Sequence, residues 1–310
     1  MYKKVLMDAL VSVVIPTYSG ENVIERAVDS VLQQTYQSLE IIVVDDNSPD
    51  SPERKATEKV MLKYKDNDKV VYLKHEVNKN GAAARNTGIR YAHGSFVAFL
   101  DDDDWFLPYK LEKQYMFMKQ HDEYEACYCL AQRGGKPIKT VPYEGDVTKE
   151  LLLMKSKMFT PSLLFRKESL ISIKGFDESY RRHQDYEILL RFFKAGFKMG
   201  CVKEILIELG KGGGNNSPTP EKLMELKKYF LTNFASSIDD VDNVEHGFKK
   251  KVIATHYGNV FLSYVLYHRY GEAISLAKKY FIYSPIDFSS AFVQRISGFF
   301  FRKCKKIFLG

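Results

Sequence analysis

The first hundred residues alternate between two hydrophobic periods, one typical of strands and the other of helices. Continuous apolar runs, which suit strands buried on both faces, occur at VSVVIPTY (11–18), EIIVVDDN (40–47), VVYLKH (70–75) and FVAFL (96–100). Between these runs, apolar residues recur at helical spacing over roughly 23–32, 52–64 and 81–92. This β-α-β-α-β-α-β order predicts an α/β fold with right-handed crossovers and a mostly parallel sheet.

The later part of the chain is mixed at first and then helical. Its apolar positions predict a helix from about Pro108, a strand at SLLFR (162–166) and a helix from Asp185 to Phe193. Glycine, asparagine and proline in KGGGNNSPTP predict a loop or linker. Beyond Pro220 we expect helices, including a pair that is broken near Gly271. The chain therefore divides into an α/β domain, residues 1–215, and a helical region, residues 216–310.

Composition is that of a soluble globular protein, with 45% hydrophobic and 27% charged residues among 310. Four irregularly spaced cysteines favour neither a disulfide framework nor a zinc site. Asp8 interrupts the first apolar stretch and no cleavage site follows it, which argues against a signal peptide. No run reaches the eighteen or so apolar residues of a membrane span. We expect a cytoplasmic protein, whose net charge of +7 suits anionic partners.

Three of the predicted strands pass directly into polar groups at their carboxyl ends. Thr17 and Tyr18 follow the first strand, Asp45 and Asp46 the second, and the run Asp101–Asp104 the fourth. Ligands of open α/β sheets bind in the crevice outside the carboxyl ends of the strands. We therefore expect these segments to converge on one site.

Four consecutive aspartates repel one another unless a cation lies among them. Mg²⁺ or Mn²⁺ prefers hard oxygen ligands and typically binds one or two carboxylates together with substrate phosphates. The alternative is a solvated acidic turn in which Asp104 caps the helix that begins near Pro108. Both interpretations can hold for different aspartates.

Three further features have a functional and a structural interpretation. Asp45 and Asp46 could bind a base or ribose, or could stabilise the turn DDNSPDSP. Arg85, in the small-residue segment GAAARNTG, could hold phosphate oxygens or form a surface salt bridge. Asp185, in the arginine-containing RRHQDYEILLRF, could act as a general base or merely stabilise a helix N-terminus.

Together these motifs resemble glycosyltransferase family 2, the inverting, nucleotide-sugar-dependent enzymes of the GT-A fold. The resemblance covers roughly residues 11–210. VSVVIPTY and EIIVVDDNSPD are similar to the family's first two strands, and NKNGAAARNTGIRYAHGSFVAFLDDDDW to the segment that leads into its DXD motif. GFDES and HQDYEILLRF resemble its acceptor-side segment and catalytic-base helix. The order and spacing of the motifs are more specific than any one of them.

The resemblance implies a role for each matching residue on the donor side. Three residues would line the nucleotide pocket: Pro16, Thr17 and Tyr18. Asp45 would bind the base, with Asp46 beside it, and Arg85 would lie near the ribose and diphosphate. The implied donor is a nucleotide-sugar, with a UDP-sugar favoured.

The resemblance also implies how the acidic run and Asp185 would act. Asp103 would bind Mn²⁺ or Mg²⁺, Asp101 would lie closer to the ribose, and Asp102 beside the sugar. Asp185 would remove the proton of the acceptor hydroxyl in a single in-line displacement, while the metal stabilises the departing nucleoside diphosphate. The implied acceptor is a glycan or lipid-linked glycan of a cell-surface polysaccharide.

One departure from the family concerns the loop after the base helix. Many members carry a histidine there that helps to hold the diphosphate or metal, whereas this chain has ELGKGGGNNSPTP. Lys211 or the group Asn215, Asn216 and Ser217 are candidate substitutes.

The C-terminal segment FVQRISGFFFRKCKKIFLG combines phenylalanines with cationic residues and contains no acidic residue. Such a helix can lie on an anionic bilayer at the inner face of the plasma membrane, which would suit a lipid-linked acceptor. Alternatively, it packs within the C-terminal helical region. The cationic residues are Arg295, Arg302, Lys303, Lys305 and Lys306.

Two other functions are compatible with such a sheet. A sugar nucleotidyltransferase would need a glycine-rich loop with arginine and lysine after the first strand, which IPTYSGENVIE lacks. A non-catalytic sugar- or lipid-binding protein would have no need of both Asp103 and Asp185. No nucleic-acid-binding motif accompanies the basic residues, so nucleic acid is not expected as a partner.

Overall fold

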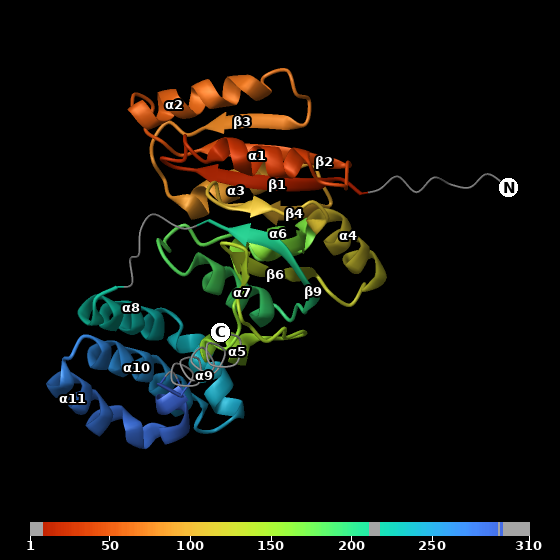
Figure 1. Cartoon of the computed structure of the whole chain (residues 1–310). Helices are drawn as coiled ribbons and strands as arrows, with labels where there is room; N and C mark the ends of the chain where they lie inside the picture. The colour runs from red at the N-terminus through yellow and green to blue at the C-terminus, as the bar shows by residue number, and fades with distance from the viewer. Residues whose placement is uncertain (1–8, 211–217, 291, 294–310) are drawn as a thin grey trace, which may run out of the picture. The chain divides into compact units, whose positions relative to one another are not determined.

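A computed structural model describes residues 9–210, 218–290 and 292–293. These residues divide into two compact units. Residues 149–155 and the described residues from 218 onward form a helical unit, and the remainder forms an α/β unit (Figure 1). The predicted loop KGGGNNSPTP lies mostly outside the described residues, since 211–217 are not among them.

The α/β unit contains one nine-stranded sheet of order β3-β2-β1-β4-β8-β6-β9-β5, with β7 paired to β6. The first four strands in this order run parallel, as predicted. β8 is antiparallel to both β4 and β6, whereas β6 and β9 are parallel. The strands are β1 Val11–Thr17, β2 Leu39–Asp45, β3 Val70–Lys74, β4 Phe96–Phe99, β5 Trp105–Phe106, β6 Ala126–Arg133, β7 Lys136–Pro137, β8 Leu163–Arg166 and β9 Met199–Leu209.

The helices of this unit confirm the predicted alternation of the first hundred residues and the predicted helices near Pro108 and Asp185. The α-helices are α1 Ile24–Leu32, α2 Pro52–Met61, α3 Gly81–Tyr91, α4 Lys110–Gln120, α6 Lys167–Ser172 and α7 Gln184–Lys194. Two short 3-10 helices are η1 Leu62–Tyr64 and η2 Thr160–Ser162.

β1 is buried along its whole length because helices cover both faces of the sheet. Val13 and Ile15 belong to the core cluster that also contains the buried side of α1. On the other face, α3 packs so closely that a Cβ added at Gly88 would lie 2.2 Å from Val14 Cγ1. The small residues of α3 thus bring this helix, and Arg85 within it, close to the end of the sheet.

The helical unit surrounds the long helix α10, whose buried residues form a second core with α11. The predicted break near Gly271 is confirmed, because α10 ends at Leu266 and α11 begins at Tyr270. None of the described helices combines the length and apolarity that crossing a membrane requires. The elements are α5 Thr148–Leu152, α8 Pro220–Asn233, α9 Ala235–Val244, α10 Phe248–Leu266, α11 Tyr270–Tyr280 and η3 Phe281–Tyr283.

Three of the four cysteines lie among the described residues, whereas most of the C-terminal segment does not. Cys127, Cys129 and Cys201 are buried free thiols, and Cys304 is outside the described residues. The basic-aromatic C-terminal segment also lies outside them, apart from Phe292 and Val293.

Replacing Gly88 with alanine should lower the free energy of unfolding of the α/β unit by about 1–3 kcal/mol, because the added methyl group collides with Val14. Urea unfolding followed by the fluorescence of Trp105, the single tryptophan, measures this change. Gly271→Ala is the control, since no atom lies within 4 Å of its added Cβ. Equal unfolding midpoints for Gly88→Ala and the wild type would contradict the close packing of α3.

Candidate active site

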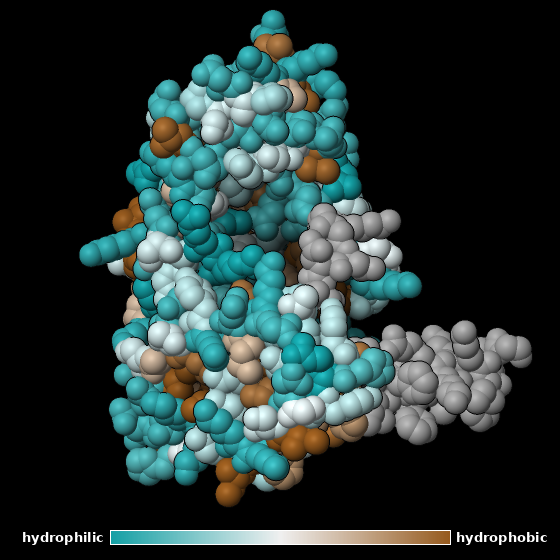
Figure 2. Space-filling view, turned by 90° about the vertical axis from the view of Figure 1, so that its left-hand side faces the viewer, coloured by the Kyte–Doolittle hydropathy of each residue, from teal (hydrophilic) through white to brown (hydrophobic). Residues whose placement is uncertain are grey.

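Two adjoining cavities open where β1, β2 and β4 end, of about 280 and 340 Å³. They share Arg85, Asp101 and Asp103. Figure 2 views the side toward which β1 and β3 point in Figure 1, and shows a hollow with a largely hydrophilic lining. The donor-side cavity, as we call the first, is lined by Pro16, Thr17, Tyr18, Asp46, Gly81, Ala84, Arg85, Asp101, Asp102 and Asp103. We call the second the Asp185 cavity.

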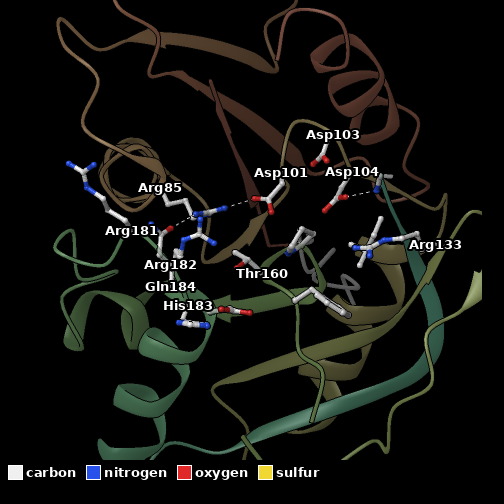
Figure 3. A pocket seen from close by; sticks show the side chains of 15 residues that line it. Arg85, Asp101, Asp103, Asp104, Arg133, Thr160, Arg181, Arg182, His183 and Gln184 are labelled. Atoms are coloured by element: carbon white, nitrogen blue, oxygen red, sulfur yellow. Dashed lines mark hydrogen bonds and ion pairs between the residues drawn. The ribbon is translucent and has the colours of Figure 1, made fainter. Parts of the chain in front are cut away.

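Arg85 joins the two cavities through its guanidinium group (Figure 3). It forms an ion pair with Asp101, which follows β4, and donates to Gln184 Oε1 at 2.7 Å. The ring of Phe176 lies beneath the guanidinium, 5.6 Å from it. Because Arg85 is only 9% exposed, the alternative of a surface salt bridge does not apply. One side chain thus connects the acidic run to the first residue of α7.

Asp102 is held by the end of β1. Its Oδ2 accepts a hydrogen bond from Thr17 Oγ1 at 2.7 Å, and a Cβ added at Gly20 would lie 2.0 Å from the same oxygen. Burial raises the pKa of Asp102 to about 6, and the neighbouring aspartates add to this effect. The structure therefore brings together the residues predicted at the ends of β1 and β4.

Asp103 is fixed through its backbone. Arg26 Nη2 donates to the Asp103 carbonyl at 2.5 Å, and the same guanidinium stacks 3.9 Å above the ring of Trp105. Gly210 packs against this carbonyl so closely that an added Cβ would lie 2.3 Å from its oxygen. Burial and the charge of Asp101 raise the pKa of the Asp103 carboxyl. Asp103 lines both cavities, while Arg26 and Gly210 hold its backbone carbonyl in place.

The alternative in which Asp104 caps the following helix is wrong. α4 begins at Lys110, and no side chain caps its N-terminus. Asp104 Oδ1 instead accepts a hydrogen bond from the backbone of Gly210 at 2.7 Å, just after β9. Burial raises the pKa of Asp104 to about 8, and the charge of Asp101 adds to this effect. Asp104 therefore ties the acidic run to β9.

The structure separates Asp45 from its neighbour Asp46. Asp45 lines neither cavity and is fully buried, because Arg54, Tyr72 and Asn47 all contact its carboxylate. Asp46 lines the donor-side cavity. Its carboxylate also accepts hydrogen bonds from the loop before α3, among them those from the backbone of residues 79 and 80 at 2.9 and 2.8 Å.

Asp185 lies in the first turn of α7 and lines the Asp185 cavity. Ile188 and Leu189 follow it by three and four residues, on the same side of α7, and are buried. Burial raises the pKa of Asp185 to about 6; the charge of Arg85 lowers it and that of Asp101 raises it. A carboxylate with such a pKa can accept a proton near neutral pH.

The described residues contain no group of three or more histidine, cysteine or acidic side chains arranged to hold a metal ion. Three carboxylates of the acidic run nevertheless line the Asp185 cavity together: Asp101, Asp103 and Asp104. Carboxylate oxygens suit hard cations such as Mg²⁺ and Mn²⁺, which commonly complete their coordination with water and substrate phosphates. The candidate substitutes for the missing histidine, Lys211, Asn215, Asn216 and Ser217, lie outside the described residues.

Several polar residues of the Asp185 cavity had not been predicted as site residues. Arg181, Arg182 and Gln184 lie within four residues of Asp185 in the sequence and line its cavity. Their closeness to a candidate base could have identified them as site residues. Arg133 at the end of β6 and Thr160 in η2 belong to no local motif. Only the fold brings these two to the cavity.

The model of the family described as "Glycosyl transferase family 2" matches residues 12–190, more than half of the chain. This stretch contains every predicted site residue. The chain therefore belongs to glycosyl transferase family 2 and is a glycosyltransferase.

Similar proteins from several organisms are also named glycosyltransferases. The amylovoran biosynthesis glycosyltransferase AmsB of Erwinia amylovora is 32% identical over 212 residues, which are 65% of this chain and 69% of AmsB. An uncharacterized glycosyltransferase of Methanocaldococcus jannaschii is 28% identical over 229 residues, 71% of this chain and 77% of the relative. A third, from Rickettsia prowazekii, is 34% identical over 62% of this chain and 61% of its own length.

Among solved structures, the S. aureus TarS fragment 1–349 in complex with UDP-GlcNAc is similar, with a TM-score of 0.58. The two chains are 17% identical, and the match covers 91% of each. The same fragment in complex with UDP has a TM-score of 0.55. At this identity the likeness concerns the fold, and it confirms the predicted GT-A fold.

Proposed function

We propose that this glycosyltransferase is an inverting enzyme that moves a sugar from a nucleotide-diphosphate donor to a hydroxyl group of a glycan or lipid-linked glycan. The observation that carries the proposal is the pair of cavities that share Arg85, Asp101 and Asp103. A donor in one cavity and an acceptor in the other would meet at these residues. In this proposal residues 1–215 form the catalytic domain.

The donor-side cavity suits a nucleotide-sugar. Pro16, Thr17 and Tyr18 would line the nucleotide, and Asp46 is the member of the Asp45–Asp46 pair that reaches the cavity. Arg85 can hold a phosphate oxygen through a charge-assisted hydrogen bond. UDP is the favoured nucleotide because TarS, a protein of the same fold, binds UDP and UDP-GlcNAc. Polysaccharide synthesis is the favoured process because AmsB is named for amylovoran biosynthesis.

Asp185 would act as the general base in the second cavity. Its carboxylate would take the proton of the acceptor hydroxyl as that oxygen forms a bond to the anomeric carbon. The bond between the anomeric carbon and the diphosphate oxygen would break in the same step, so that the nucleoside diphosphate leaves with the bonding electrons. Attack from the side opposite the leaving group inverts the configuration at this carbon.

Asp103 would hold a divalent cation, Mn²⁺ or Mg²⁺. A bound cation would offset negative charge on the diphosphate and on the neighbouring carboxylates. The raised pKa of Asp103 supports this assignment, because it reflects carboxylates crowded together in a buried place. Asp101, which is already paired with Arg85, would lie closer to the ribose than to the metal.

Asp185→Asn should reduce transfer at least about 100-fold, since general bases typically contribute that much, and should leave donor affinity within about twofold. Initial rates of transfer and calorimetric titration with UDP measure the two quantities. Asp66→Asn, at a side chain that is 89% exposed, is the matched control and should retain full activity. Full transfer activity in Asp185→Asn would exclude this residue as the base.

The value of kcat/KM for transfer should fall at acidic pH as Asp185 becomes protonated. The base must be ionised, so kcat/KM should be highest above pH 6 and fall about tenfold per unit below it. Burial is the largest cause of the raised pKa of Asp185, while the charge of Arg85 lowers this pKa and that of Asp101 raises it. A profile that stays flat down to pH 5 would contradict the assignment.

Asp103→Ala should weaken Mn²⁺ binding and abolish transfer. Trp105 lies two residues from Asp103, so Mn²⁺ added together with UDP should quench its fluorescence in the wild type. The variant should need at least about tenfold more Mn²⁺ for the same quenching. Altering the groups around a bound metal typically lowers its affinity by at least that factor. An unchanged Mn²⁺ titration in Asp103→Ala would remove Asp103 from the metal site, and Asp66→Asn again serves as the control.

A further inference from the structure

We propose that Arg181 and Arg182 form a recognition site for an anionic group, a phosphate or a carboxylate, on the acceptor. This inference rests on the proposed function and narrows its acceptor to an acidic one. The two arginines precede α7 and line the Asp185 cavity. Neither lines the donor-side cavity.

The four guanidinium groups of the Asp185 cavity are not equivalent. Arg85 is engaged by Asp101 and Gln184. Arg133 interacts electrostatically with Asp103 and Asp104. Arg181 and Arg182 form no ion pair with any described residue.

The two carboxylates that precede the arginines in sequence form hydrogen bonds with other residues. Asp177 accepts hydrogen bonds from the backbone and hydroxyl of Ser179, at 2.9 and 2.7 Å. Glu178 accepts one from Asn86 Nδ2 at 2.9 Å. Among the residues outside the description, Asp8 is the single acidic side chain, so the segment 211–217 after β9 offers no carboxylate either.

The location of the pair indicates which substrate would bring the anion. In Figure 3, Arg182 extends in the direction of Arg85, on the same side of the cavity as His183 and Gln184, and Arg133 lies on the opposite side. Asp185 follows Arg182 by three residues and lines the same cavity. The guanidinium of Arg181 points away from Arg182 in this view, so Arg182 is the main contact and Arg181 adds positive charge beside it. An anion bound by Arg182 would therefore lie beside the proposed base, where the acceptor must present its hydroxyl group.

The chemistry of guanidinium explains why a neutral acceptor alone does not account for this arrangement. Neutral sugars are recognised by hydrogen-bonding groups of many kinds, whereas the planar fork of arginine matches the paired oxygens of phosphate and carboxylate. Both arginines are exposed, so water competes for them and the gain in affinity is moderate. We expect a factor of roughly ten, the size of one charge-assisted hydrogen bond.

The test compares small acceptor analogues on enzyme that is saturated with UDP and Mn²⁺, so that the diphosphate site is already filled. Glucose 1-phosphate, glucuronic acid and methyl glucoside are titrated by calorimetry into the wild type and the variants Arg181→Gln and Arg182→Gln. At least one anionic analogue should bind about tenfold more tightly than methyl glucoside, and Arg182→Gln should lose most of this advantage. The two anionic analogues tell phosphate recognition from carboxylate recognition.

Arg90→Gln is the charge-matched control, because Arg90 is exposed on α3 and lines neither cavity. It should keep the preference for the anion. The proposal is overturned if no anionic analogue binds more tightly than methyl glucoside, or if Arg182→Gln keeps the preference. It is also overturned if Arg182→Gln weakens UDP binding instead, since the arginine would then serve the donor. Failure of UDP to bind the wild type would instead count against the proposed function. The same analogues would then be titrated into the free enzyme, so that the two failures can be told apart.

Discussion

The active site depends on the guanidinium of Arg85, which connects two parts of the fold that the chain order keeps apart. One of its nitrogens pairs with Asp101 at the end of the parallel half of the sheet, and another donates to Gln184 at the start of α7. The sheet changes from parallel to mixed pairing between these two parts. Arg85 can make this connection because small residues of α3, such as Gly88, let this helix pack tightly on β1. The donor-side carboxylates and the proposed base are thereby held as one site.

The acidic run shows how a fold holds like charges together. Each aspartate is restrained by a different element: Asp101 by α3, Asp102 by the end of β1, Asp103 through Arg26 of α1, and Asp104 by the residue after β9. Crowding and burial raise the pKa values of the last three. Such an arrangement stores electrostatic repulsion that a cation can relieve, which is the physical basis for assigning a metal to it. The single tryptophan stacks on the arginine that holds Asp103, and so it can report on this segment.

Local sequence patterns were sufficient to predict the α/β alternation, the break before α11 and the helix that carries Asp185, because each depends on the periodicity of neighbouring residues. They also predicted which strand ends would converge, since parallel strands end at one edge of a sheet. They were insufficient for Asp104, whose partner is the backbone of Gly210, more than a hundred residues away. The same limit applies to Asp45 and Asp46: adjacent in sequence, they differ because Arg54 and Tyr72 enclose only the first. Arg133 and Thr160 join the site through tertiary structure alone.

In the proposed mechanism one site performs a single displacement, with a base on one side of the anomeric carbon and the diphosphate on the other. The configuration of the first-formed glycosidic linkage tests it most directly, by proton NMR during transfer from an α-linked UDP-sugar. We expect a β-linked product with the large anomeric coupling of that configuration in a gluco-configured sugar. An α-linked first product would mean retention, and would contradict both the single displacement and the role of Asp185 as its base.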